Sequence, residues 1–253
     1  MHRMQFVVAL FLLCEGTEFC LAIDFCNMTE CHGLQHLGCE NDLTFHSSCM
    51  HTHVLVNMQM YRNYLLKIHN KYREDVAAGT IIGLPMASHM PELKWHSKLA
   101  LIAEYHVKRC LQSMFRYCMA VTNFPDPAVN YGSNLLDTQS LPSYTPSPNS
   151  EKLTAQVEQW THQVYKLAQG HLFGNEVHEI RNILNDENQF VGCAAADYSD
   201  RAASRFVLIC YYNNRIEAMA PIYKKGTFAD KNCPHGISED YPKLCKMLTD
   251  ISD

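Results

Sequence analysis

The chain has 253 residues, 47% of them hydrophobic and 19% charged, which is enough for one domain with a sizeable core and short appendages. Its formal net charge is −5 at pH 7, and no basic block occurs along it. We therefore expect neither nucleic acid nor an anionic membrane surface as a partner.

The first 22 residues have the pattern of a secretory signal peptide. A short basic start, MHRM, precedes the apolar run QFVVALFLLC, and the segment ends in the small residue Ala22. The apolar run is shorter than the roughly 20 residues of a spanning helix. We expect a signal peptide over 1–22, and no later stretch predicts a membrane span. The mature chain is thus predicted to be secreted to the extracellular space, where disulfides persist.

Ten cysteines remain after this cleavage, an even number that favours a disulfide framework in a secreted chain. The competing hypothesis is structural zinc, but no C-x2-C pair occurs. Residues 23–56 hold four of the cysteines with little apolar periodicity, and we predict an irregular arm stapled by disulfides. Its histidines before Cys49 are interpreted as solvated loop residues. Asn27 begins a glycosylation sequon, Asn-Met-Thr.

Helical spacing of apolar residues begins after this arm. Tyr61, Leu65 and Val76 have this spacing and predict a helix that ends before Gly79. Further helices are predicted over 95–110 and 153–167, with a short helical turn over 177–184. In the second helix, His96 and His106 are interpreted as surface and core-edge residues. Residues 123–150 are rich in Pro, Ser and Asn and predict an irregular connection, with a brief ordered piece near 131–135.

Two short apolar runs, FVGCAAADY and RFVLICYYN, are joined by the polar segment SDRAAS. They predict adjacent antiparallel strands with Cys193 and Cys210 near their middles. The two cysteines form a bridge if they face each other, and they are buried thiols if they do not. The segment APIYKKG that follows is expected to be an edge strand or an extended piece. Helices on a small, mainly antiparallel sheet make this an α+β fold.

Several segments together resemble one family, the CAP superfamily of cysteine-rich secretory, antigen-5 and pathogenesis-related proteins, and within it the insect antigen-5-related branch. The resemblance rests on their order and spacing over nearly the whole mature chain. The segments are His69-Asn70-Lys71-Tyr72-Arg73, Leu93-Lys94-Trp95, Gly192-Cys193-Ala194-Ala195, Cys210-Tyr211-Tyr212-Asn213 and Pro221-Ile222-Tyr223.

The resemblance implies a three-layer α-β-α CAP sandwich with a cysteine-rich N-terminal extension. The CAP domain would cover 57–226, after the arm over 23–56 and before a C-terminal cysteine loop and tail over 227–253. The implied disulfide pairs are Cys26–Cys39, Cys31–Cys118, Cys49–Cys110, Cys193–Cys210 and Cys233–Cys245.

Members of the family commonly place two histidines and two acidic residues in a central groove, where some bind a divalent metal. At the four matching positions this chain carries Met114, Ser133, Gln163 and Glu179. Such a set suits a divalent cation poorly and offers no base beside a nucleophile. Ser133 is interpreted as a turn residue. We expect no metal, no cofactor and no enzymatic activity.

The resemblance and this altered groove predict a secreted, non-catalytic protein that binds an extracellular protein or receptor in a reproductive, salivary or haemolymph fluid. One alternative is residual metal chemistry through Glu179 and the preceding His178, if a slip in the loop turns His178 inward. The other alternative is a carrier of sterol or another small lipid. The residues expected to line its cleft are Phe124, Tyr131, Leu135, Leu136, Leu141 and Tyr144.

Overall fold

The computed structural model describes residues 24–50, 52–110, 116–137, 148–171, 174–199, 203–217, 219–228 and 232–247. The predicted signal peptide lies outside these ranges, as do Met114, Leu141 and Tyr144. Within them, no helix combines the length and the apolar composition needed to cross a membrane.

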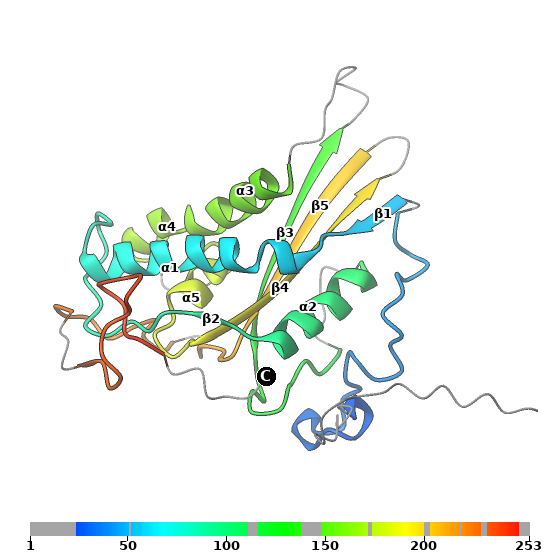
Figure 1. Ribbon diagram of the computed structural model, residues 1–253, viewed down its shortest axis with the longest axis horizontal. Coiled ribbons are helices and arrows are strands. Elements are labelled where there is room, and N and C mark those ends of the chain that lie inside the picture. The colour runs from blue at the N-terminus through cyan, green and yellow to red at the C-terminus, as the bar shows by residue number, and fades with distance from the viewer. Residues whose placement is uncertain are drawn as a thin grey trace, which may run out of the picture.

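A single twisted sheet runs through the middle of the molecule (Figure 1), built in the described residues from five strands. Along its main path the order is β1-β4-β5-β3, with antiparallel pairs throughout, and the short β2 pairs with β4 in parallel. The strands are β1 (Thr52–Leu55), β2 (Lys94–Trp95), β3 (Ala128–Asp137), β4 (Phe190–Ser199) and β5 (Ala203–Tyr212).

The predicted hairpin forms the centre of this sheet. Its two strands, β4 and β5, place Cys193 directly opposite Cys210, and the two residues form a disulfide with their Cα atoms 4.1 Å apart. Both cysteines are buried, so this disulfide lies inside the core.

The expectation of an irregular connection over 123–150 is wrong for β3. This strand has ten residues and pairs with β5 along its whole length. Its Asn and Gly residues have weak strand preference, but strand preference depends strongly on the neighbouring strand. The apolar β5 imposes the pairing here, and Ser133 is accordingly a strand residue, not the turn residue we expected.

Helices cover both faces of the sheet, giving the three layers of an α-β-α sandwich (Figure 1). The helix α2 packs on one face, and the other helices cover the opposite face. The helices are α1 (Arg62–Ala78), α2 (Ser97–Arg109), α3 (Asn149–Thr161), α4 (Val164–Ala168) and α5 (His178–Leu184), with 3-10 turns at Phe25–Asn27, Thr29–Cys31 and Met58–Met60.

Alternation along β5 divides the core into two clusters, one on each side of the sheet. Leu208 and Tyr212 pack with α1, α3 and α5, whereas Ile209 and Tyr211 pack with α2. On β4, Gly192 allows α2 to approach closely, because a Cβ atom there would lie 2.1 Å from the backbone nitrogen of Ala100.

Five disulfides reinforce the described chain, and they are the five pairs that the family resemblance implies. Two of them tie the N-terminal arm to the end of α2 and the segment after it, and the others close shorter loops. The pairs are Cys26–Cys39, Cys31–Cys118, Cys49–Cys110, Cys193–Cys210 and Cys233–Cys245.

The arm is more ordered than the sequence predicts. It contributes β1 to the sheet, and its His36 is only 2% exposed. The His36 ring stacks on Phe25 and hydrogen-bonds to the backbone of Ala120 and Gly38. The interpretation of the arm's histidines as solvated is therefore wrong for His36. This residue packs next to Ala120, which is 84 residues away in the sequence.

Three further expectations are also wrong. His96 and His106 are each only 2% exposed, because α2 lies flat on the sheet. The third predicted helix is divided into α3 and α4 around His162. Of the two forms expected for the segment APIYKKG, the edge strand is wrong: its residues form no strand, and Lys225 makes an isolated bridge to Ala87.

Candidate functional site

A cleft of about 380 Å³ lies between the edge strand β3, the helix α3 and the start of α5. It brings together three of the four positions singled out in the sequence, Ser133, Gln163 and Glu179. The lining residues are Tyr131, Gly132, Ser133, Gln156, Gln159, Trp160, Gln163, Asn175 and Glu179.

The side-chain amide of Gln163 holds one end of this cleft together. Its Nε2 donates to the Glu179 carboxylate at 2.5 Å, and its Oε1 accepts from the backbone N–H groups of Glu179 and Ile180, each at 3.1 Å. Gln163 thus links the junction between α3 and α4 to the first turn of α5. The one carboxylate among the described lining residues is already engaged by a neutral amide.

Gln156 forms the floor of the cleft opposite Gly132. A Cβ atom on Gly132 would lie 2.1 Å from Cδ of Gln156, so only glycine lets the amide pack this close to the strand. Gln156 is 1% exposed; its Nε2 donates to Oε1 of Gln159 at 2.8 Å, while its own Oε1 has no hydrogen-bond partner. We did not predict Gln156, but its spacing of four from Trp160 and seven from Gln163 puts all three on one helical face.

His178 does not turn inward. Its side chain is exposed, and its Nε2 donates to the carbonyl oxygen of Val129 at 3.1 Å. The described residues contain no group of three or more His, Cys, Asp and Glu side chains arranged to hold a metal ion. The donors present in the cleft, a hydroxyl, amides and one carboxylate, also fit a borderline cation such as zinc poorly.

Behind the cleft lies a chain of buried hydrogen bonds that sequence reasoning missed. Asn182 donates to Asn130 at 2.9 Å, Asn130 donates to the Tyr212 hydroxyl at 3.2 Å, and that hydroxyl lies 3.0 Å from Nε2 of His69. The other ring nitrogen, Nδ1, lies 2.8 Å from the carbonyl oxygen of Leu65, so Nδ1 carries the proton and Nε2 accepts from Tyr212. Burial lowers the pKa of His69 to about 4, which keeps the ring neutral.

This network reaches the cleft through backbone. Asn130 also donates to the carbonyl oxygen of Glu179 at 3.1 Å, which fixes the start of α5 against β3. The cleft is therefore built on rigid elements on three sides.

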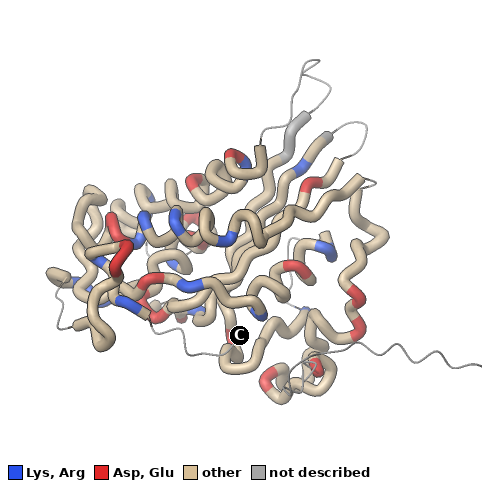
Figure 2. The backbone as a smooth tube through the Cα atoms, viewed as in Figure 1, with Lys and Arg blue, Asp and Glu red and all other residues tan. Residues whose placement is uncertain are grey.

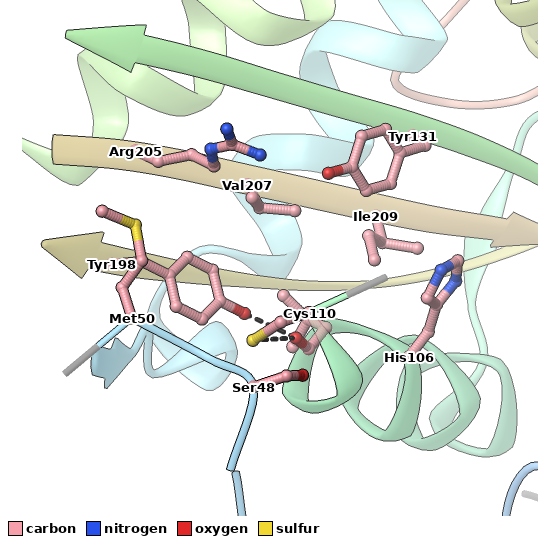
Figure 3. A pocket seen from close by; sticks show the side chains of 10 residues that line it. Ser48, Met50, His106, Cys110, Tyr131, Tyr198, Arg205, Val207 and Ile209 are labelled. Atoms are coloured by element: carbon pink, nitrogen blue, oxygen red, sulfur yellow. Dashed lines mark hydrogen bonds between the residues drawn. The ribbon is translucent and has the colours of Figure 1, made fainter. Parts of the chain in front are cut away.

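A second cavity, of about 200 Å³, lies on the opposite face of the sheet beneath α2 (Figure 3). The Tyr198 hydroxyl donates to the carbonyl oxygen of Val107 at 2.5 Å, and the His106 ring lies 2.9 Å from the Tyr211 hydroxyl. These contacts join α2 to the sheet. Its lining residues are Ser48, Met50, His106, Val107, Cys110, Tyr131, Tyr198, Arg205, Val207 and Ile209.

A third cavity, of about 670 Å³, is mainly apolar and lies near the C-terminal ends of α1 and α4. Arg181 borders it and donates to the carbonyl oxygens of Glu217 and Ala220. The lining residues are Gly83, Leu84, Pro85, Leu167, Ala168, Gly170, Arg181, Met219, Ala220, Pro221, Ile222, Tyr223, Lys224 and Lys225. The sequence prediction put the apolar cleft elsewhere: Phe124, one of the expected lining residues, packs against His96 and Phe190 in the core.

Residues 66–212, more than half of the chain, match the model of the cysteine-rich secretory protein family, CAP. The chain belongs to the CAP family. The matched segment runs from α1 to the end of β5 and includes the cleft with Ser133, Gln163 and Glu179.

This CAP protein is similar to insect venom allergen and antigen 5-like proteins and to a tabinhibitin. It is 25% identical over 231 residues to venom allergen-1 of Aedes aegypti, with 88% of this chain and 87% of that relative covered. It is 27% identical to the antigen 5 like allergen Cul n 1 of Culicoides nubeculosus, covering 76% and 91% of the two chains. It is 26% identical to tabinhibitin 2 of Tabanus yao, covering 91% and 89%.

Among solved structures, BmVAL-1 superposes with a TM-score of 0.56 at 17% identity, covering 77% of this chain and 96% of that one. At this identity the match concerns the fold alone. The disulfides and the similarity to venom allergens are consistent with secretion.

Proposed function

We propose that this CAP protein is a secreted, non-catalytic binding protein that acts by engaging another macromolecule, an extracellular protein or receptor, in a reproductive, salivary or haemolymph fluid. One observation carries the proposal: the Gln163 amide occupies the Glu179 carboxylate, which is the one acidic group among the described residues lining the cleft. The scaffold is kept, while the cleft holds neutral hydrogen-bonding groups in place of metal ligands.

The absence of catalysis is part of the proposal. Ser133 would need a base within hydrogen-bond reach to act as a nucleophile. The described residues that line the cleft include no histidine or lysine, and the Glu179 carboxylate is paired with an amide. The cleft therefore supplies surface for recognition and no activated group.

A zinc titration by calorimetry tests the first half of the proposal. We expect no saturable one-to-one binding in the micromolar range, and the same result for His178→Ala. Tight one-to-one binding by the unmodified protein that His178→Ala abolishes would contradict the proposal and favour residual metal chemistry.

Capture experiments test the second half. The purified protein, immobilised through its C-terminus, is exposed to the fluid in which it is secreted, with excess free protein as competitor. We expect a partner that the competitor displaces and that a reduced and alkylated sample does not retain, since the disulfides hold the binding surface in shape. Retention that free protein does not compete would count against a specific partner.

The apolar cavity supports a second candidate, a carrier of a small lipid. A volume of about 670 Å³ with Arg181, Lys224 and Lys225 among its lining residues suits an amphiphile with an apolar body and an acidic head group. Titration with fatty acids and sterols is the test, using Ala168→Trp to fill the cavity. Ala155→Trp, on the exposed face of α3, is the matched control. Saturable binding that only Ala168→Trp removes would favour the carrier function, and no binding would exclude it.

A further inference from the structure

The cleft has a buried polar side chain at its base, although its described lining residues lack the set of two histidines and two acidic residues that is common in the family. Gln156 is 1% exposed, lines the cleft, and has one amide atom without a partner. Exchanging the O and N assignments of this amide does not remove the deficit, because Gln159 faces only one of the two atoms. A buried polar atom left unpaired is unfavourable. Oε1 of Gln156 has almost no accessible surface, so a ligand in the cleft supplies the missing hydrogen bond when the Gln156 side chain turns its amide toward the cleft, and the penalty is then removed.

The chemistry of the lining narrows the class of ligand. Among the described residues around the cleft there is no Lys, Arg or His, so a phosphate, sulfate or carboxylate would find no compensating charge. A metal cation would find one carboxylate, already bonded to Gln163. An apolar ligand would cover amide and hydroxyl groups without replacing their hydrogen bonds. A neutral ligand rich in hydroxyl groups meets none of these objections.

Hydroxyl groups also match the lining in detail. Each hydroxyl donates one hydrogen bond and accepts others, so neighbouring hydroxyls on a sugar ring can serve an amide and a carboxylate oxygen together. Glu179 has one oxygen in contact with Gln163, and Ser133 and Gln156 lie around the same cleft. A peptide fits less well, because it carries one N–H donor per residue and its side chains would meet a polar lining.

We propose that this cleft is a subsite for a neutral sugar residue, and that the glycan of a glycoprotein partner supplies it. The inference rests on the proposed binding function, because it names the ligand class for the same groove. Gly132 is part of the site, since it gives the Gln156 amide its place against β3. The volume of about 380 Å³ lies within the roughly 300–1,000 Å³ range of small-molecule sites.

Saturation-transfer NMR and titration with methyl glycosides of mannose, galactose, glucose and N-acetylglucosamine test the subsite directly. We expect saturable binding of at least one glycoside, weakened about tenfold by Gln156→Met and by Ser133→Ala, which is the factor for losing one neutral hydrogen bond. Ser133→Ala is a small change that keeps the test valid if Gln156→Met folds poorly. The matched control is Gln169→Met, an exposed glutamine outside the cleft, which should bind like the unmodified protein.

Two results would overturn the inference: no binding of any glycoside, or binding that neither cleft variant weakens. A preference for sulfated over neutral sugars would also contradict it, because the cleft has no cation to favour it. Enzymatic deglycosylation of a captured partner separates this inference from the proposed function. Capture that persists after deglycosylation leaves the binding function standing and refutes the sugar subsite, whereas lost capture supports both.

Discussion

The buried His69 should make the stability of this protein fall as the pH drops from about 6.5 to about 4. The ring is fully buried, and burial lowers its pKa from 6.5 to about 4, with the positive charge of Arg73 acting in the same direction. Between these pH values the unfolded chain binds a proton at this position that the native chain excludes, so acid favours unfolding. A pH of 5 lies about 1.5 units below the ordinary histidine pKa of 6.5 that applies to the unfolded chain. Excluding the proton from the native state at this pH therefore costs about 2 kcal/mol of stability relative to neutral pH.

Urea unfolding at pH 7 and pH 5 measures this effect in the unmodified protein and in His69→Gln. Burial also lowers the pKa of His36 and His89, so the unmodified protein alone does not isolate His69. The difference in unfolding free energy between pH 7 and pH 5 should be about 2 kcal/mol smaller in His69→Gln than in the unmodified protein. Tyr212→Phe, which removes the hydroxyl that contacts the ring, should lower stability by similar amounts at both pH values. An unchanged pH difference in His69→Gln would refute the argument.

Three other substitutions test the framework around the site by denaturant unfolding. Arg73 donates five hydrogen bonds to four backbone carbonyl oxygens, so Arg73→Met should cost about 3–5 kcal/mol, and a loss below 1 kcal/mol would show that water replaces the guanidinium. Replacing Cys31 and Cys118 together by serine removes a disulfide between residues 87 positions apart and should lower the free energy of unfolding by about 2–5 kcal/mol. A denaturation midpoint equal to that of the unmodified protein would contradict this prediction. Gly192→Ala should cost about 3 kcal/mol by forcing α2 away from β4, and an unaltered stability would mean that the helix can shift freely.

Much of the fold could be predicted because the relevant signals are local. The helices α1 and α2 follow the 3.6-residue spacing of their apolar residues, and the hairpin of β4 and β5 follows from two apolar runs with a polar turn between them. The strand β3 could not be predicted in this way. Apart from Tyr131, the residues from Asn130 to Asn134 have little strand preference, and they become a strand because β5 offers a complementary edge.

The candidate site was predictable only as a set of positions. Family resemblance identified Ser133, Gln163 and Glu179, and the fold brings these three to one cleft. What sequence could not supply was the pairing between them. The hydrogen bond from Gln163 to Glu179 depends on how α3 and α5 pack, across sixteen residues of sequence. The lack of a partner for Oε1 of Gln156 likewise depends on tertiary packing.

The sequence by itself predicted an α+β fold and a secreted chain with disulfides, because a signal pattern, an even number of cysteines and regular apolar spacing depend on residue type and order alone. The resemblance also predicted four groove positions, and three of them, Ser133, Gln163 and Glu179, lie in one cleft. Only the tertiary structure decided that His36, His96 and His106 are buried and that His69 lies in a hydrogen-bonded chain leading to Asn182. The physical reason is that burial and hydrogen-bond pairing are properties of contacts between distant segments, which local sequence patterns do not encode.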